Sequence, residues 1–205
     1  ADADTAQLSD LQIKSLKGGQ LDIVDTLSTG QIRALTAAQV GSLTEEQLRA
    51  MSTEQVGAFT STQVQALKAT QLNAIDALGS AVKMLSTKQM AALSVEQIGL
   101  LGDDQVNALS GTQVKALGTK VASLSDTQIR NLGAVQARAM TTAQLGALSG
   151  SQVAALSTDN LRVLSAAQVT ALGTDVGQFS DEQLGALLPT QAAALTSTQI
   201  GALSS

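Results

Sequence analysis

Three pairs of adjacent carboxylates are the residues of this chain best suited to chemistry: Glu45-Glu46, Asp103-Asp104 and Asp181-Glu182. Such pairs act as general acid and base, or as ligands of Ca²⁺. No calcium-loop spacing accompanies them, and each pair directly follows a Ser, Thr or Gly residue at the same place in a repeat. Carboxylates in the first turn of a helix are favoured by its dipole. We therefore interpret the pairs as helix-start residues and expect no metal site.

The composition removes most other catalytic chemistry. The 205 residues include no His, Cys, Trp or Tyr, and no Gly-rich phosphate loop occurs. General acid–base catalysis, thiol nucleophiles and zinc sites draw mainly on those missing residue types. We expect no enzymatic activity, no cofactor and no small-molecule substrate.

The repeat that carries the carboxylates is eight residues long: Leu, Ser or Thr, two variable residues, Gln, an aliphatic residue, a variable residue and Ala, here called positions a to h. From Leu8 to Leu203 the chain holds 24 units, of which 19 have eight residues, three have seven and two have eleven. An unbroken α-helix turns about 100° per residue, so leucines eight apart would wind around it and form no face. The repeat therefore needs a break in every unit.

Positions b and e supply that break. Position b is Ser or Thr in 16 of the 19 octads, and position e is Gln in 18 of them, with Asn160 as the exception. Ser/Thr-x-x-Gln is the capping box: the hydroxyl accepts from the N–H of the Gln, whose side chain reaches back to the N–H of the capping residue. The predicted N-caps include Ser28, Thr36, Thr44, Ser52, Thr60, Ser149, Ser157 and Ser165. The glutamines are predicted to cap helices and to form hydrogen bonds across layers, with a recognition ladder as the alternative; they include Gln39, Gln47, Gln55, Gln63, Gln144, Gln152 and Gln168.

Two further signals place the start of a helix at position b. The only proline, Pro189, falls at c, the first helical position, where proline is favoured. Acidic residues gather at c and d and basic residues at g, which is the distribution that the helix dipole favours. Each octad is therefore predicted to form one very short helix, from c to about the next a.

A helix of two turns is unstable alone, because its nucleation is costly. We predict an all-α fold, a solenoid or superhelix of very short capped helices with one helix per eight-residue repeat, in which the a and f side chains bury one another. Three or four helices would form a layer. The array is taken as a single domain over residues 1–205, with repeats at about 8–203. A β-solenoid is the alternative, but the abundant Ala, Leu and Gln favour helix.

The units of irregular length are predicted to correct the register of the spiral. The seven-residue units begin Leu78-Gly79, Leu117-Gly118 and Leu172-Gly173 and lack the Gln, and the eleven-residue units span Leu16 to Leu27 and Leu67 to Leu78. Deleting one residue would tighten a corner, and inserting one turn would lengthen a helix. A binding insertion is the alternative role.

The net charge and the hydropathy of the chain limit the kinds of partner that we expect. The net charge is −5, whereas a protein that wraps DNA needs a basic stripe, so we expect no nucleic acid. Leu43-Thr44-Glu45-Glu46-Gln47 resembles the opening of the repeats in bacterial transcription-activator-like effectors, but the base-reading loop of those repeats is missing. No apolar run approaches 18 residues, so we expect no membrane span. The absence of Cys suits a protein that works outside the cell.

Over nearly its whole length the chain resembles the tandem Leu-Ser/Thr-x-x-Gln-Val-x-Ala arrays of very long bacterial surface proteins, often labelled haem-utilisation or adhesion proteins. Residues 141–148 form one such stretch. The resemblance implies an extracellular or cell-surface setting and a stalk-like role, and it carries no functional residues across. The haem label finds no support in the residues, because His, Tyr and Cys are absent.

Three functions fit these features. The first, which we expect, is a structural rod or stalk segment that acts as a spacer or display scaffold on a bacterial surface or in a secreted protein. The second is a self-assembling subunit of an extracellular filament, with copies stacked end to end. The third is a repeat scaffold that binds a surface partner.

Overall fold

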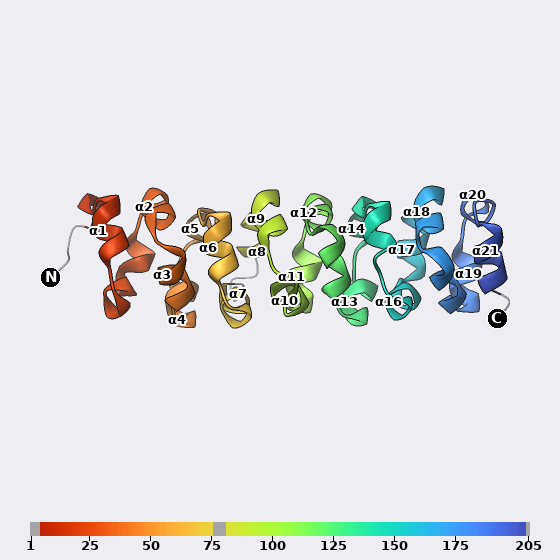
Figure 1. The fold of residues 1–205 in the computed structure, drawn as a ribbon, viewed down its shortest axis with the longest axis horizontal. Helices are drawn as coiled ribbons and strands as arrows, with labels where there is room; N and C mark the ends of the chain where they lie inside the picture. The colour runs from red at the N-terminus through yellow and green to blue at the C-terminus, as the bar shows by residue number, and fades with distance from the viewer. Residues whose placement is uncertain (1–4, 76–80, 204–205) are drawn as a thin grey trace. The chain divides into compact units, whose positions relative to one another are not determined.

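The computed structural model describes residues 5–75 and 81–203, and these residues form short helices and no strand. Contacts divide the chain into two compact units, Ala1–Ala108 and Leu109–Ser205, called here the N-terminal and C-terminal units (Figure 1). The single domain expected from the sequence stays a prediction.

The helices of the N-terminal unit follow one another closely. They are η1 (Thr5–Gln7), α1 (Asp10–Ser15), η2 (Gly18–Thr26), α2 (Thr29–Ala34), α3 (Ala37–Ser42), α4 (Glu45–Ala50), α5 (Thr53–Gly57), α6 (Ser61–Ala66), α7 (Ala69–Ile75), α8 (Ala81–Met84), α9 (Thr87–Ala92), α10 (Val95–Gly99) and α11 (Asp103–Ala108). The C-terminal unit contains α12 (Gly111–Ala116), η4 (Gly118–Ser123), α13 (Asp126–Arg130), α14 (Ala134–Ala139), α15 (Thr142–Leu145), α16 (Gly150–Ala155), α17 (Thr158–Val163), α18 (Ala166–Ala171), η5 (Gly173–Gln178), α19 (Asp181–Ala186), α20 (Pro189–Ala192) and α21 (Ser197–Ala202).

Each octad forms one helix, so the predicted all-α array of very short capped helices is confirmed. Two extended residues make the corner between helices: Leu35 has φ −56° and ψ 141°, and Thr36 has φ −73° and ψ 155°. α3 and most of the other helices end at h, whereas α5, α10, α13, α15 and α20 end one or two residues earlier. The N–H of Leu35 still binds the carbonyl of Ile32 at 3.3 Å. Pro189 begins α20, at the helical position predicted for it.

Helices three units apart pack against each other, which gives three repeat units per turn. In the N-terminal unit α3 lies beside α6 and α6 beside α9, as Figure 1 shows. In the C-terminal unit α12 lies beside α14, and the two units between them are η4 and α13. In the same unit α14 lies beside α17, with α15 and α16 between them. The sequence predicted either three or four helices per layer, and the packing of the helices shows that the number is three.

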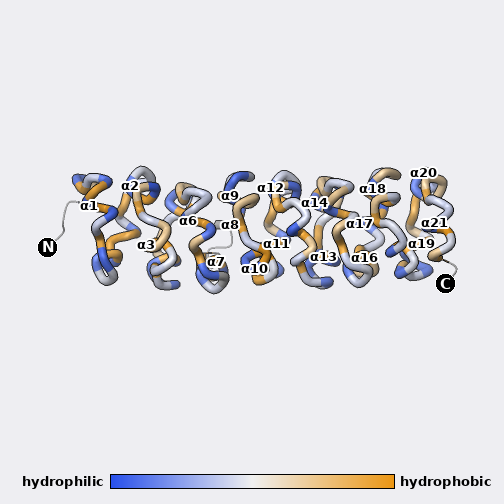
Figure 2. The backbone as a smooth tube through the Cα atoms, in the orientation of Figure 1, coloured by the Kyte–Doolittle hydropathy of each residue, from blue (hydrophilic) through white to orange (hydrophobic). Residues whose placement is uncertain are grey.

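The core consists of aliphatic side chains from positions f and a. Val40, Val64 and Val114, all at f, are fully buried, and the leucines at a, such as Leu35 and Leu43, are nearly so. In Figure 2 the bends along the upper and lower edges of the tube are mostly hydrophilic, and the hydrophobic segments lie between these edges. Burying an aliphatic side chain contributes about 1.5–3 kcal/mol, which is what holds helices too short to persist alone.

The seven-residue units form tight corners, as their length predicts. Leu117 follows α12 in the right-handed helical region, and Gly118, the first residue of the 3₁₀-helix η4, has φ +59°. Gly173, the first residue of η5, repeats this geometry with φ +62°. The eleven-residue unit from Leu16 forms the nine-residue 3₁₀-helix η2. The start of the seven-residue unit at Leu78, and the end of the eleven-residue unit before it, lie outside the described residues.

Replacing either glycine of these corners with alanine is expected to destabilise the chain. A side chain in the left-handed region costs about 1–2 kcal/mol, so Gly118→Ala and Gly173→Ala should each lower the free energy of unfolding by that amount. Urea titration followed by circular dichroism measures it. Gly201→Ala is the matched control, because Gly201 is helical with open space around it, and alanine should stabilise it. Equal effects at Gly118 and Gly201 would contradict the account.

Candidate functional site

All eight N-caps named from the sequence lie at corners and cap the helix that follows. The hydroxyl oxygen of Thr60, for example, accepts from the N–H of Gln63 at 3.2 Å, while Oε1 of Gln63 accepts from the N–H of Thr60 at 2.7 Å. Ser28, Thr36, Thr44, Ser52, Ser149 and Ser165 show the same reciprocal pair, and Ser157 caps the N–H of Asn160.

The glutamine side chains have a second partner that capping does not account for. Nε2 of Gln63 donates to the carbonyls of Ile32 (2.8 Å) and Leu35 (2.7 Å), which belong to the corner one turn earlier. These carbonyls are near the end of a helix, where backbone acceptors lack intrahelical partners. Gln63 is 2 % exposed. One amide thus caps the start of its own helix and the end of another.

This arrangement recurs from turn to turn, and we call it the glutamine ladder. Its members named from the sequence bind carbonyls of the preceding turn: Gln39, Gln55, Gln63, Gln144, Gln152 and Gln168. Gln47 differs, because its Nε2 binds the carboxylate of Asp22 at 2.8 Å on the surface. The ladder replaces, across turns, the hydrogen bonds that two-turn helices cannot make within themselves.

The carboxylate pairs lie where the repeat places them. They occupy the first turns of α4, α11 and α19, and all six side chains are exposed. Glu45 pairs with Arg49 one turn on, at 2.9 Å, which is a surface interaction of little energy. Among the described residues no group of three or more acidic side chains could hold a metal ion.

One acidic residue of a first turn has a perturbed pKa. A hydrogen bond from its own backbone N–H, followed by one from the Ser52 hydroxyl, lowers the pKa of Glu54 below its ordinary value. The ionised carboxylate therefore serves as a further acceptor at the start of α5, which is the role that the dipole argument assigns to positions c and d.

The model of one repeat family matches the chain in three tandem stretches. This family, described as the ALTTAQ repeat, matches residues 45–77, 82–119 and 121–158, together just over half of the chain. The chain belongs to the ALTTAQ repeat family. Taken as one-letter residue codes, the name resembles positions h to e of the octad: residues 34–39 match it except at Ala37, where the name has a second Thr. A comparison with curated proteins gives no match.

The chain is thus a helical repeat scaffold built from ALTTAQ repeats. Its glutamines are structural, and the sequence predicted both halves of their role, capping and hydrogen bonds across layers. Capping uses only the oxygen of each amide and leaves a nitrogen that needs an acceptor. Which carbonyls accept could not be predicted, because that depends on the number of units per turn. None of the helices in the described ranges is both long and apolar enough to cross a bilayer.

Asn160 is the one octad position e without Gln, and its part of the ladder is incomplete. Its shorter side chain reaches a single carbonyl, that of Ile129, at 3.4 Å, although it is 1 % exposed. Asn160→Gln is expected to raise the free energy of unfolding by about 1 kcal/mol, because a net hydrogen bond contributes about that much. Thermal melts measure the gain, and the reverse change Gln152→Asn should cost a similar amount. A loss of stability in Asn160→Gln would count against the ladder.

The N-cap hydroxyls are expected to contribute less than the amides. Ser149, Ser157 and Ser165 accept at 3.3, 3.1 and 3.3 Å, which is long for an N–H···O bond. Replacing all three with alanine should lower the free energy of unfolding by about 0.5–1 kcal/mol per residue, the lower part of the range for N-caps. Urea titration of the triple variant measures this, and no change at all would contradict the capping role.

Proposed function

We propose that this chain is a spacer or display scaffold, a structural stalk segment of a bacterial cell-surface or secreted protein, with no enzymatic activity and no cofactor of its own. The glutamine ladder is the observation that carries the proposal. Within each unit it joins successive turns by hydrogen bonds that are largely buried, so the length of an array follows from the number of its turns.

The exposed residues of the repeat support the same function. Positions c, d and g carry mostly Gly, Ala, Ser, Thr and acidic residues, which give a surface with few features for a specific reaction. Net charge away from zero favours solubility in a repetitive chain with an aliphatic core. The surface setting rests on the resemblance to long bacterial surface proteins.

The proposal is tested by removing one turn from the C-terminal unit. Residues 148–171 are three consecutive octads, and their deletion leaves every later repeat on its original side of the spiral. Spin labels are attached through Thr127→Cys and Ser197→Cys, which are unique because the chain lacks cysteine. The distance between the labels should shorten by about 8–10 Å, one interhelical spacing, with helical circular dichroism retained. An unchanged distance, or loss of the fold, would exclude a modular spacer.

A second candidate is association of copies through their turns. Every inner turn packs on a turn of the same repeat, so the surface of a turn is complementary to another copy. In the N-terminal unit α3 packs on α6 in this way, and in the C-terminal unit α14 packs on α17. Sedimentation velocity at rising concentration separates the two candidates, because a spacer alone stays monomeric.

A further inference from the structure

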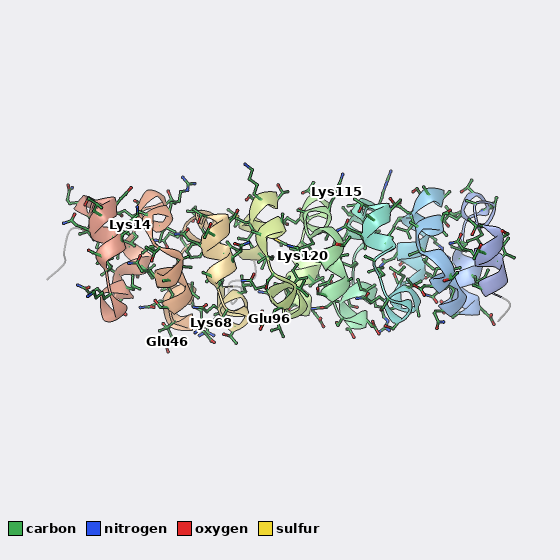
Figure 3. The ribbon with its side chains drawn as sticks, viewed as in Figure 1. Lys14, Glu46, Lys68, Glu96, Lys115 and Lys120 are labelled. Carbon is green, nitrogen blue, oxygen red and sulfur yellow. The ribbon has the colours of Figure 1, made fainter. Side chains whose placement is uncertain are left out.

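The three-unit turn brings two basic side chains of the C-terminal unit together. Lys115 and Arg138 occupy position g of α12 and α14, which pack against each other one turn apart. Both side chains are exposed, and Figure 3 labels Lys115 at the outer side of α12. Neighbouring helix axes lie about 8–10 Å apart, so the two cations follow each other at about that spacing.

A groove of about 520 Å³ lies between these two residues and the next corner. Besides Lys115 and Arg138, hydroxyl groups line it, from Thr112, Thr141 and Thr142. The Thr141 oxygen accepts from the N–H of Gln144, so its own O–H remains free to donate. The groove therefore offers two cations and a row of hydroxyls to a molecule lying along the spiral.

No carboxylate balances these cations within the groove. Residues 109–205 carry five basic and five acidic residues, whereas residues 1–108 carry seven and twelve. A second groove of similar size in the same unit, about 530 Å³, is lined by both Arg130 and Glu182 and so has no excess of charge. The excess of positive charge is a property of the groove at Lys115 and Arg138.

We propose that this groove binds a linear acidic polysaccharide, a function that goes beyond that of a spacer. The carboxylates of successive sugars would pair with Lys115 and Arg138, since guanidinium and ammonium groups donate strongly to carboxylates. The threonine hydroxyls would bind the sugar hydroxyls between the charges.

Other polyanions fit the groove less well. Single-stranded nucleic acid is bound by aromatic platforms as well as cations, and the two aromatic residues, Phe59 and Phe179, are buried in the core. Bound peptides use a sheet edge, a deep apolar groove or, where they are acidic, a cluster of arginines. The described part of the chain contains no strand, and this groove holds a single arginine beside one lysine, with three threonines and Gln168 as its other polar side chains.

The binding test uses a fluorescent oligogalacturonate, a linear chain of uronic acids, and measures anisotropy with the full chain. Neutral dextran of equal length and a single-stranded oligothymidylate are the comparison probes. The paired variants are Lys115→Ser with Arg138→Ser, and Arg33→Ser with Arg130→Ser, which change the net charge equally at exposed positions.

The expected result is binding of the oligogalacturonate that weakens from about 50 to about 200 mM salt, because the pairs are exposed and screened. The Lys115/Arg138 variant should bind about tenfold more weakly, the loss expected for two charge-assisted contacts, and the Arg33/Arg130 variant should bind as the unmodified chain does. Absence of binding, equal loss in both variants, or tighter binding of dextran or oligothymidylate would overturn the proposal.

Discussion

Replacing Gln63 with leucine is expected to lower the free energy of unfolding by about 3–5 kcal/mol, because buried groups that lose their hydrogen bonds cost about 1–3 kcal/mol each. The change removes the partners of the Thr60 N–H and of the Leu35 carbonyl, and one of the two partners of the Ile32 carbonyl. Leucine has nearly the volume of glutamine, so the loss reports hydrogen bonding rather than a cavity. Urea titration measures the change in midpoint.

Gln47→Leu is the control for this substitution. Gln47 caps Thr44 in the same way, but its Nε2 binds an exposed carboxylate, which water can replace. Gln47→Leu should therefore lower the free energy of unfolding by only about 1 kcal/mol. If the two variants were equally destabilised, the bonds between turns would not be what holds the spiral together.

Gln63→Glu distinguishes donation by the amide from mere polarity. A protonated carboxyl can donate to the carbonyls of Ile32 and Leu35, whereas a carboxylate can only face them with like partial charge. Folding therefore raises the pKa of the introduced group above its unfolded value of about 4.3. The stability of the variant, relative to that of the unmodified chain, should be greatest below about pH 4 and fall as the pH rises through the folded pKa. If the difference in free energy of unfolding between the variant and the unmodified chain did not change with pH, donation by the amide of Gln63 would be contradicted.

The sequence was sufficient to predict the local structure, because each local choice in the octad agrees with the others. The hydroxyl at b, the amide at e, Pro189 at c and the sorted charges all place a helix start at the same position, and the structure has a helix there. The buried apolar positions followed too, since only a and f are regularly large and apolar, but the burial of the amides at e did not.

What the sequence could not supply was the number of units per turn and everything that depends on it. Lys115 and Arg138 are 23 residues apart and become neighbours only when three units, one of them with seven residues, complete a turn. The acceptors of Gln63 lie 28 and 31 residues earlier for the same reason. Pitch is set by how closely backbones of adjacent turns approach, and that contact involves small residues that look interchangeable in a sequence.

Gly41 marks one such close approach in the N-terminal unit. A Cβ atom on Gly41 of α3 would lie 2.9 Å from the backbone carbonyl oxygen of Ala66 on α6, a distance that real Cβ atoms essentially never show. Gly177 and Ala202 repeat the contact in the C-terminal unit, at 2.6 Å. The carbonyl of Gly41 also accepts from Nε2 of Gln71 at 3.2 Å, so spreading these helices would strain the ladder.

Gly41→Leu is therefore expected to cost about 3 kcal/mol of unfolding free energy, the upper part of the range for overpacking, although leucine is the better helix former. Gly185→Leu is the matched control, because Gly185 lies in α19 with nothing within 4 Å of an added Cβ. That variant should gain about 0.8 kcal/mol from helix propensity alone. The opposite signs are the informative result, since both positions are glycine at g and differ only in whether a neighbouring turn lies against them. Urea midpoints that rise for both variants would show that the turns are not held at the spacing that the glycine permits.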